Sequence, residues 1–124
     1  VSEITKATVS GLAGKEYLRA TDKTRHANSG DITFSAETDM IFDSSDAACI
    51  ITDSGWNRKI KVEKSGSNTT VVWNPWIEKS KKMADYGDEE YHEMVCVEAA
   101  NAHKDARTLA PGKTHKIGTR ISLA

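Results

Sequence analysis

The stretch that decides the fold is Thr69-Thr70-Val71-Val72-Trp73-Asn74-Pro75-Trp76. Its first five residues are all β-branched or aromatic, which favours a β-strand. Asn74 can cap the free N–H groups at the start of a helix, and Pro75 suits the first helical position. The stretch therefore predicts a strand over 69–74 that leads directly into one short helix near residues 75–84.

A second decisive stretch is Met94-Val95-Cys96-Val97-Glu98-Ala99-Ala100-Asn101. In a strand, Cys96 and Glu98 fall on one face and Val95 and Val97 on the other. The pattern predicts a strand that is buried on both faces, where an ionised carboxylate is costly unless it is paired or used. Glu98 is therefore either a salt-bridged residue at a strand end or a functional carboxylate.

The remainder of the chain alternates β-rich runs with Gly, Asn, Asp and Ser, which favours antiparallel structure. Ser65–Asn68 and Pro111–Gly112 are interpreted as hairpin turns. We expect a single all-β domain over residues 1–124, built as an antiparallel β-sandwich with one short helix. The expected strands are 5–12, 15–20, 31–36, 38–43, 47–52, 58–64, 69–74, 93–99, 106–109 and 114–122.

Composition excludes several classes of partner. The 124 residues include 17 basic and 18 acidic side chains, so no dominant positive field is expected and neither nucleic acid nor an anionic membrane is a predicted partner. No apolar run approaches the 18 residues that a membrane span requires, and no signal peptide precedes Val1. Cys49 and Cys96 lie in apolar runs that favour buried free thiols. We expect a cytoplasmic protein.

Several motifs occur in a recognisable order. They are Val9–Leu12, Gly30–Phe34, Glu37–Asp39, Val71–Trp76, the acidic stretch Asp85–Tyr91 and Met94–Asn101. In this order they closely resemble the C-terminal part of the hexose-6-phosphate mutarotases, the glucose-6-phosphate 1-epimerase branch of the aldose 1-epimerase superfamily. The resemblance implies a galactose mutarotase-like β-sandwich of about half the family's length. It also implies a sugar or sugar phosphate as partner, and chemistry that needs no cofactor and no metal.

The resemblance assigns roles to two carboxylates. Glu98 matches the family's general base, and Asp39 matches an Asp that lies near the sugar hydroxyls. The family has Arg and Tyr where this chain has Met40 and Phe42, so we expect this part of the site to have lost polar groups. An exposed strand-end Asp is the alternative interpretation of Asp39.

Four further residues are candidates for substrate binding. Trp73 and Trp76 could stack on a sugar ring or could be core aromatics. His103, five residues after Glu98, could approach the site or could be a solvated loop residue. Arg58, followed by Lys59, could bind an anion or could lie at a solvated strand end. No two histidines have metal-ligand spacing, so no metal site is predicted.

The family's catalytic His and its phosphate-binding Arg residues lie upstream of the part that this chain matches. The chain is therefore interpreted either as an epimerase-like protein with Glu98 as base, or as a non-catalytic carbohydrate-binding or structural module. An excised piece of a longer enzyme is a third possibility. A half-length sandwich would expose apolar faces and free strand edges, so we expect a homodimer.

Overall fold

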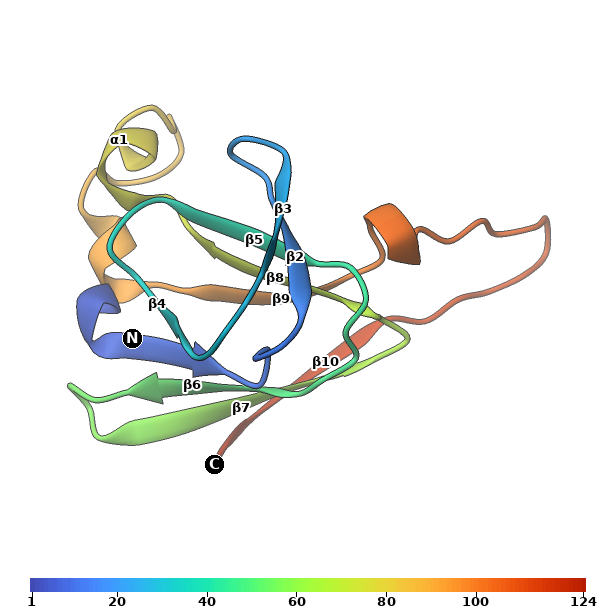
Figure 1. The fold of residues 1–124 in the computed structure, drawn as a ribbon, viewed down its shortest axis with the longest axis horizontal. Coiled ribbons are helices and arrows are strands. Elements are labelled where there is room, and N and C mark those ends of the chain that lie inside the picture. The colour runs from blue at the N-terminus through green and yellow to red at the C-terminus, as the bar shows by residue number, and fades with distance from the viewer.

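The computed structural model describes residues 1–124 and consists of two antiparallel five-stranded sheets (Figure 1). Sheet A has the order β10-β7-β6-β1-β4, and sheet B has the order β3-β2-β5-β8-β9. The strands of sheet A are β1 (Ala7–Ser10), β4 (Ile32–Thr33), β6 (Cys49–Asp53), β7 (Arg58–Ser65) and β10 (Gly118–Leu123). Those of sheet B are β2 (Glu16–Arg19), β3 (Thr24–Ala27), β5 (Thr38–Phe42), β8 (Thr69–Asn74) and β9 (Cys96–Ala100). The expected antiparallel β architecture with one short helix is confirmed.

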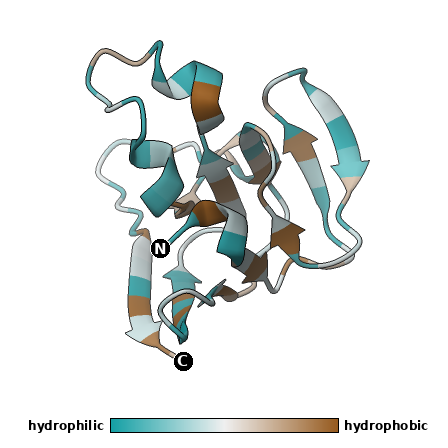
Figure 2. Cartoon of the chain, turned by 90° about the vertical axis from the view of Figure 1, so that its left-hand side faces the viewer, coloured by the Kyte–Doolittle hydropathy of each residue, from teal (hydrophilic) through white to brown (hydrophobic).

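The core lies between the two sheets and follows the two-residue alternation of the strands. Along β8, Thr70 and Val72 are fully buried, whereas Val71 and Trp73 on the opposite face are only partly buried. Both sheets contribute to the apolar cluster, which Figure 2 shows as hydrophobic bands on the strands. Its members are Ile4, Ala7, Val9, Leu12, Ile32, Phe34, Phe42, Cys49, Ile51, Val62, Val72 and Tyr91.

The helical segments are short. They are α1 (Trp76–Ser80) and the 3-10 turns η1 (Ile4–Lys6), η2 (Glu90–Glu93) and η3 (His103–Asp105). The helix predicted near 75–84 thus begins where expected but ends early, because the backbone bonds of Lys82 and Met83 reach back only three residues and tighten the chain into turns. No helix in the structure is long and apolar enough to cross a membrane.

The buried Asn74 organises the end of β8. Its Oδ1 accepts the Trp76 N–H at 2.9 Å, as expected of a residue that satisfies a free N–H at the start of a helix. Its Nδ2 donates to the carbonyl oxygens of Tyr91 at 2.8 Å and Met94 at 2.9 Å. One side chain therefore joins β8, α1 and the segment that leads into β9.

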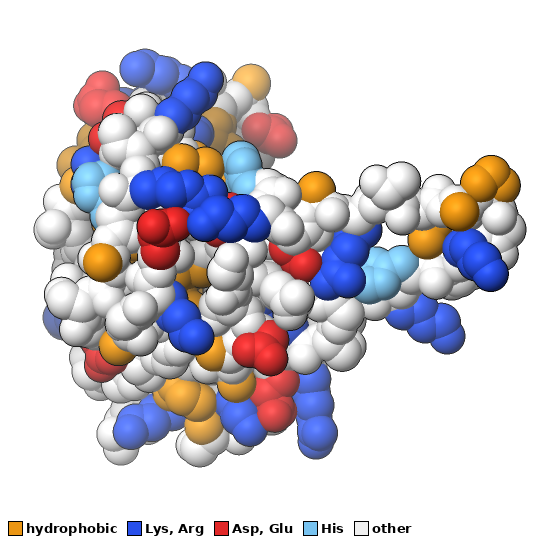
Figure 3. All heavy atoms as spheres, turned by 45° about the vertical axis from the view of Figure 1, so that its right-hand side comes forward, with side chains coloured by type: hydrophobic (Ala, Val, Ile, Leu, Met, Phe, Trp, Pro, Cys, Tyr) orange, Lys and Arg blue, Asp and Glu red, His pale blue; other side chains and the backbone are white.

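Two expected hairpin turns and one expected strand were wrong, and one strand was not predicted. Ser65–Asn68 is not a hairpin turn, because β7 belongs to sheet A and β8 to sheet B. Pro111–Gly112 does form a turn, but it lies in an irregular arm, residues 106–117, that links β9 of sheet B to β10 of sheet A, and no strand forms over 106–109. The arm projects from the body (Figure 3). Strand β3 was not predicted, because its residues Thr24–Ala27 are largely exposed and polar.

The expected two-sided burial of the Glu98 strand was also wrong. β9 is the last strand of sheet B and pairs only with β8. Its other residues are half-buried and Glu98 is exposed, because no strand pairs with its free edge.

Three aspartates with almost no solvent exposure are fully engaged in the fold: Asp43 at 3%, Asp53 at 0% and Asp105 at 7%. Arg25 donates to both oxygens of Asp43 and lowers the pKa of that carboxyl. Burial raises the pKa of Asp53 and Asp105, but hydrogen bonds outweigh burial and leave both pKa values lowered. The ionised forms of these three carboxyls therefore stabilise the folded chain.

We predict that this stabilisation disappears in acid. A lowered folded-state pKa contributes stability above the unfolded-state value, about 3.9 for Asp, and that contribution is lost as the pH falls through the folded-state value. Urea unfolding between pH 7 and pH 3 should show the free energy of unfolding falling below about pH 4.5. Asp53→Asn should lower stability at pH 7 by about 3 kcal/mol and flatten the acid dependence. An unchanged acid slope in this variant would contradict the assignment.

Candidate functional site

The outer face of sheet B brings Asp39 and Glu98 together. In the register of the sheet, Asp39 lies opposite Trp73, and Glu98 lies opposite Val71 on the same central strand, β8. Residues directly opposite in antiparallel strands point to the same side, and positions 71 and 73 share a face. Strands β5, β8 and β9 lie side by side in Figure 1. Asp39, Trp73 and Glu98 therefore occupy one surface, which we call the outer face.

The apolar residues of the outer face form its floor. Ile41 lies opposite Val71, and Cys96 lies opposite Trp73. All four are partly buried, and none belongs to the core cluster or to the residues packed against it. The outer face is thus a half-exposed apolar surface with a carboxylate on each side of β8.

The carboxylates of Asp39 and Glu98 have no partner in the chain. Neither accepts a hydrogen bond from a side chain or from the backbone, and neither forms an ion pair. Burial raises the pKa of Glu98, and the nearby charge of Asp39 raises it further. Burial also raises the pKa of Asp39, and Glu37 adds to this effect while Lys79 opposes it. Both groups are therefore free to accept hydrogen bonds from a ligand and are better proton acceptors than solvated carboxylates.

Met40 and Phe42, which stand where the family has Arg and Tyr, lie on the opposite side of β5 from Asp39. Phe42 is fully buried in the core, and Met40 packs against the core from the same inner face of β5. Strand alternation turns both side chains away from Asp39.

The two tryptophans lie in different places. Trp73 is half-buried on the outer face, in register with Asp39, where an aromatic ring can stack on a sugar. Trp76 begins α1 and packs against the core, with its ring centre 5.3 Å from that of Tyr91. Of the two interpretations given to Trp76, a core aromatic and a sugar-stacking ring, the structure shows a core aromatic.

His103 and Arg58 are not brought to the two carboxylates. His103 is exposed in η3 and forms no hydrogen bond or ion pair with Glu98. Its neighbour Lys104 forms an ion pair with Glu16 at 3.1 Å. Arg58 lies in sheet A and forms an ion pair with Asp53 at 3.1 Å.

Sequence reasoning did not single out Lys79 as a residue near the site. Its Nζ lies 3.3 Å from Oε1 of Glu37, and its charge acts on Asp39. The link between α1 and β5 follows once β8 is known to pair with β5, because Thr38 then lies opposite Asn74. No sequence motif marks that pairing.

Comparison with known proteins establishes the family. Residues 1–122 match the family model described as aldose 1-epimerase. The chain belongs to the aldose 1-epimerase family. A Cenchrus ciliaris protein named "Putative glucose-6-phosphate 1-epimerase" is 39% identical over 126 residues, which cover 100% of this chain and 37% of that protein.

Two solved structures resemble the chain in fold. A Salmonella typhimurium crystal structure described as a "putative mutarotase" is 32% identical with a TM-score of 0.74, over 80% of this chain and 34% of the other. The structure of HI1317 is 21% identical with a TM-score of 0.80, over 98% of this chain and 43% of the other. At this identity the similarity supports the fold and nothing more. The chain thus spans less than half the length of these relatives.

We predict that the two outer-face carboxylates titrate as neighbours. Asp39→Asn should lower the pKa of Glu98, because it removes the negative charge that disfavours ionisation while leaving the burial unchanged. Lys79→Met should raise the pKa of Asp39, because it removes the opposing positive charge. Carboxyl ¹³C chemical shifts followed against pH measure both values. An unaltered Glu98 titration in the Asp39 variant would show that the two groups do not interact.

Proposed function

We propose that the outer face binds a sugar or sugar phosphate and takes part in the interconversion of its anomers. The observation that supports this proposal is the pair of unpartnered carboxylates with raised pKa, Asp39 and Glu98, on either side of β8. The strongly buried carboxylates of the chain, Asp43, Asp53 and Asp105, all have partners in the fold. The Cenchrus ciliaris relative carries the name of a glucose-6-phosphate 1-epimerase, so glucose 6-phosphate is the substrate to test first.

The chemistry needs one proton acceptor and one proton donor. Glu98 is the proposed base: it takes the proton from the C1 hydroxyl, a solvent water donates a proton to the ring oxygen, and the C1–O5 bond opens to give the aldehyde and a free C5 hydroxyl. Rotation about the C1–C2 bond exposes the other face of the aldehyde, and the reverse proton transfers close the ring. The raised pKa of Glu98 brings it closer to neutrality, which favours reversible transfer.

The remaining residues of the face serve binding. The Trp73 ring can stack on the apolar side of a pyranose, and Asp39 can accept hydrogen bonds from sugar hydroxyls. Lys79, held by Glu37, opposes protonation of Asp39 and so favours the acceptor form. This arrangement fixes the sugar ring across β8 with its reactive carbon toward β9.

A binding module without catalysis is the second candidate function. It is favoured by the position of His103, which is exposed and forms no hydrogen bond or ion pair with Glu98. Without a well-placed acid, ring opening slows by about a hundredfold or more. In this case Asp39, Trp73 and Glu98 would retain the sugar and would not turn it over.

We predict measurable but slow mutarotation of α-glucose 6-phosphate by this chain in a coupled dehydrogenase assay. Glu98→Gln should reduce the rate at least about 100-fold without altering stability, because the amide keeps the shape and loses the base. Glu93→Gln is the matched control, since the exposed side chain of Glu93 has no hydrogen-bond or ion-pair partner. Equal loss in both variants, or none in Glu98→Gln, would exclude Glu98 as the base. Sugar binding without any turnover would favour the binding module.

We further propose that the chain forms a homodimer. The arm residues Leu109 and Ile117 are 55% and 47% exposed on a segment that projects from the body (Figure 3). Apolar side chains on a projecting arm are covered when the arm packs on a second copy of the chain.

The dimer can be tested by its mass. Light scattering at micromolar concentration should give about twice the 13.6 kDa of the chain. Replacing Leu109 and Ile117 together by Ser should shift the mass to that of the monomer, because the change removes apolar contact area without touching the core. A monomer in the unmodified chain would contradict the proposal.

The proposed compartment is the cytoplasm. Cys49 and Cys96 are both free thiols, the first buried and the second partly buried, and burial raises the pKa of each. Unpaired cysteines of this kind fit a reducing environment.

A further inference from the structure

Arg58 has an orientation that the fold fixes and a hydrogen-bonding capacity that the fold does not use. Its Nε donates to Oδ2 of Asp53 at 3.1 Å, and the guanidinium carbon lies 4.4 Å from the centre of the Trp56 ring. The terminal nitrogens Nη1 and Nη2 form no hydrogen bond and no ion pair within the chain. By contrast, Arg25 and Arg19 use both of theirs. The side chain of Arg58 is 36% exposed, so the free nitrogens are accessible.

The group that orients Arg58 is itself immobilised. Asp53 is fully buried, and the backbone N–H of Ser2 donates to both of its carboxylate oxygens at 3.1 Å. The Ser2 hydroxyl donates to Oδ1 at 2.6 Å. Because the Nε contact and the stacking on Trp56 together fix the guanidinium plane, little rotamer entropy remains to be lost when Nη1 and Nη2 bind a ligand.

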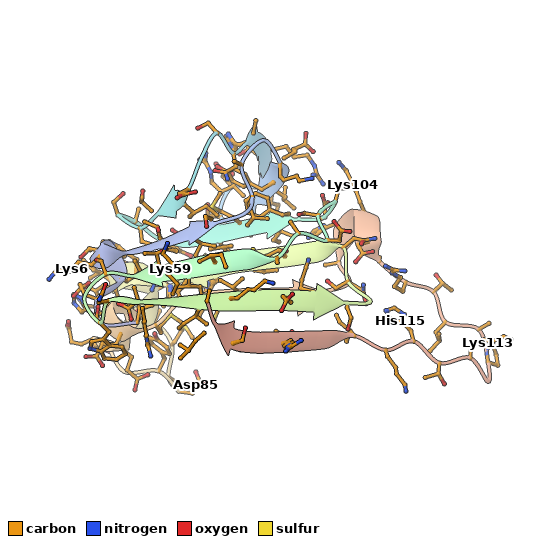
Figure 4. All side chains as sticks on the ribbon, turned by 90° about the horizontal axis from the view of Figure 1, so that it is seen from below. Lys6, Lys59, Asp85, Lys104, Lys113 and His115 are labelled. Carbon is orange, nitrogen blue, oxygen red and sulfur yellow. The ribbon has the colours of Figure 1, made fainter.

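A cavity opens at this guanidinium. It has a volume of about 520 Å³, and its wall is formed by Thr52, Asp53, Ser54, Asn57, Arg58, Lys59, Leu123 and Ala124. Lys59 lies at the start of β7, at the end of sheet A opposite the arm (Figure 4). The volume is that of a small-molecule site. The wall combines two cations, hydroxyl and amide groups with the carboxylate of Asp53, which is already engaged by Ser2 and Arg58, and with the apolar Leu123 and Ala124.

We propose that this cavity binds a phosphate group, held in a bidentate manner by Nη1 and Nη2 of Arg58. A fixed guanidinium with two parallel free N–H directions matches two oxygens of a phosphate, and Lys59 adds a second positive charge. The ionised Asp53 reduces the net positive charge, so the dissociation constant is expected near about 1 mM. The site lies in sheet A and does not include the outer face of sheet B, so the inference does not depend on the proposed epimerase activity.

The binding can be measured on the whole chain by NMR. Inorganic phosphate should shift the Arg58 Nε–Hε signal and the Trp56 indole N–H signal, with saturation near the expected millimolar constant. Glycerol 3-phosphate distinguishes a free ion from a phosphate monoester: equal affinity means that the phosphate group alone is recognised, and tighter binding means that a phosphorylated metabolite is recognised. Neutral glucose should leave both signals unchanged.

Variants separate a ligand role from a purely structural one. Arg58→Lys keeps a cation beside Asp53 but removes the two terminal guanidinium nitrogens that hold the phosphate, and should weaken phosphate binding by at least about tenfold. Lys59→Gln, which removes no ion pair, should weaken it by about threefold, whereas Lys82→Gln removes an equal charge elsewhere and should not. Should Arg58→Lys unfold the chain, the Lys59 and Lys82 pair still decides the question.

The outcomes are distinct. Saturable shifts at Arg58 and Trp56 that are weakened by Lys59→Gln and retained in Glu98→Gln support the phosphate site. Absence of shifts at these two residues in about 20 mM phosphate, or equal weakening by Lys59→Gln and Lys82→Gln, overturns it. Because Glu98→Gln removes the proposed base and leaves this site intact, failure of one proposal is distinguishable from failure of the other.

Discussion

The pairing of β8 with β5 on one side and β9 on the other is the constraint on which the candidate site depends. Its register places Asp39 opposite Trp73 and Glu98 opposite Val71, so that residues about 60 positions apart in the sequence share one face. A slip of one residue in either pairing would turn a carboxylate into the core. The burial of Val72 on the inner side opposes such a slip, since its core contacts would be lost with it.

The fold also separates structural carboxylates from available ones. Asp43, Asp53 and Asp105 are surrounded by donors, and the resulting pKa values are lowered. Asp39 and Glu98 lack donors, and their pKa values are raised. Desolvation acts on both groups, so the difference arises from hydrogen bonds and neighbouring charges. An unused acceptor at a half-buried position such as that of Asp39 is destabilising unless a ligand satisfies it, and Glu98 adds an exposed acceptor with a raised pKa beside it. These two observations are the physical basis for assigning function to the pair.

Much of the fold could be predicted from local patterns, because β-branched runs and turn residues mark strands wherever they pair. The strand over 69–74 and the helix start after Asn74 followed from short motifs, and the family resemblance singled out Asp39 and Glu98. The pairing of strands did not follow from such motifs. Three features depend on which sheet each strand joins. They are the connection over residues 65–68, which is not a hairpin, the inward direction of Met40 and Phe42, and the position of Lys79 beside Asp39. β3 was missed because a polar edge strand has no apolar alternation, and β9 was expected to be buried because sequence cannot show that its outer edge has no neighbour.

The account rests on the claim that a sugar lies across β8 between Asp39 and Glu98. The most direct test is a chemical-shift titration of the isotopically labelled chain with neutral glucose, which the Arg58 cavity should not retain. The account predicts saturable shifts of the Trp73 indole N–H and of the backbone amides of Asp39 and Glu98, with the Trp56 indole unchanged. Shifts confined to sheet A, or a Trp73 indole that does not respond while other sites bind the sugar, would contradict it.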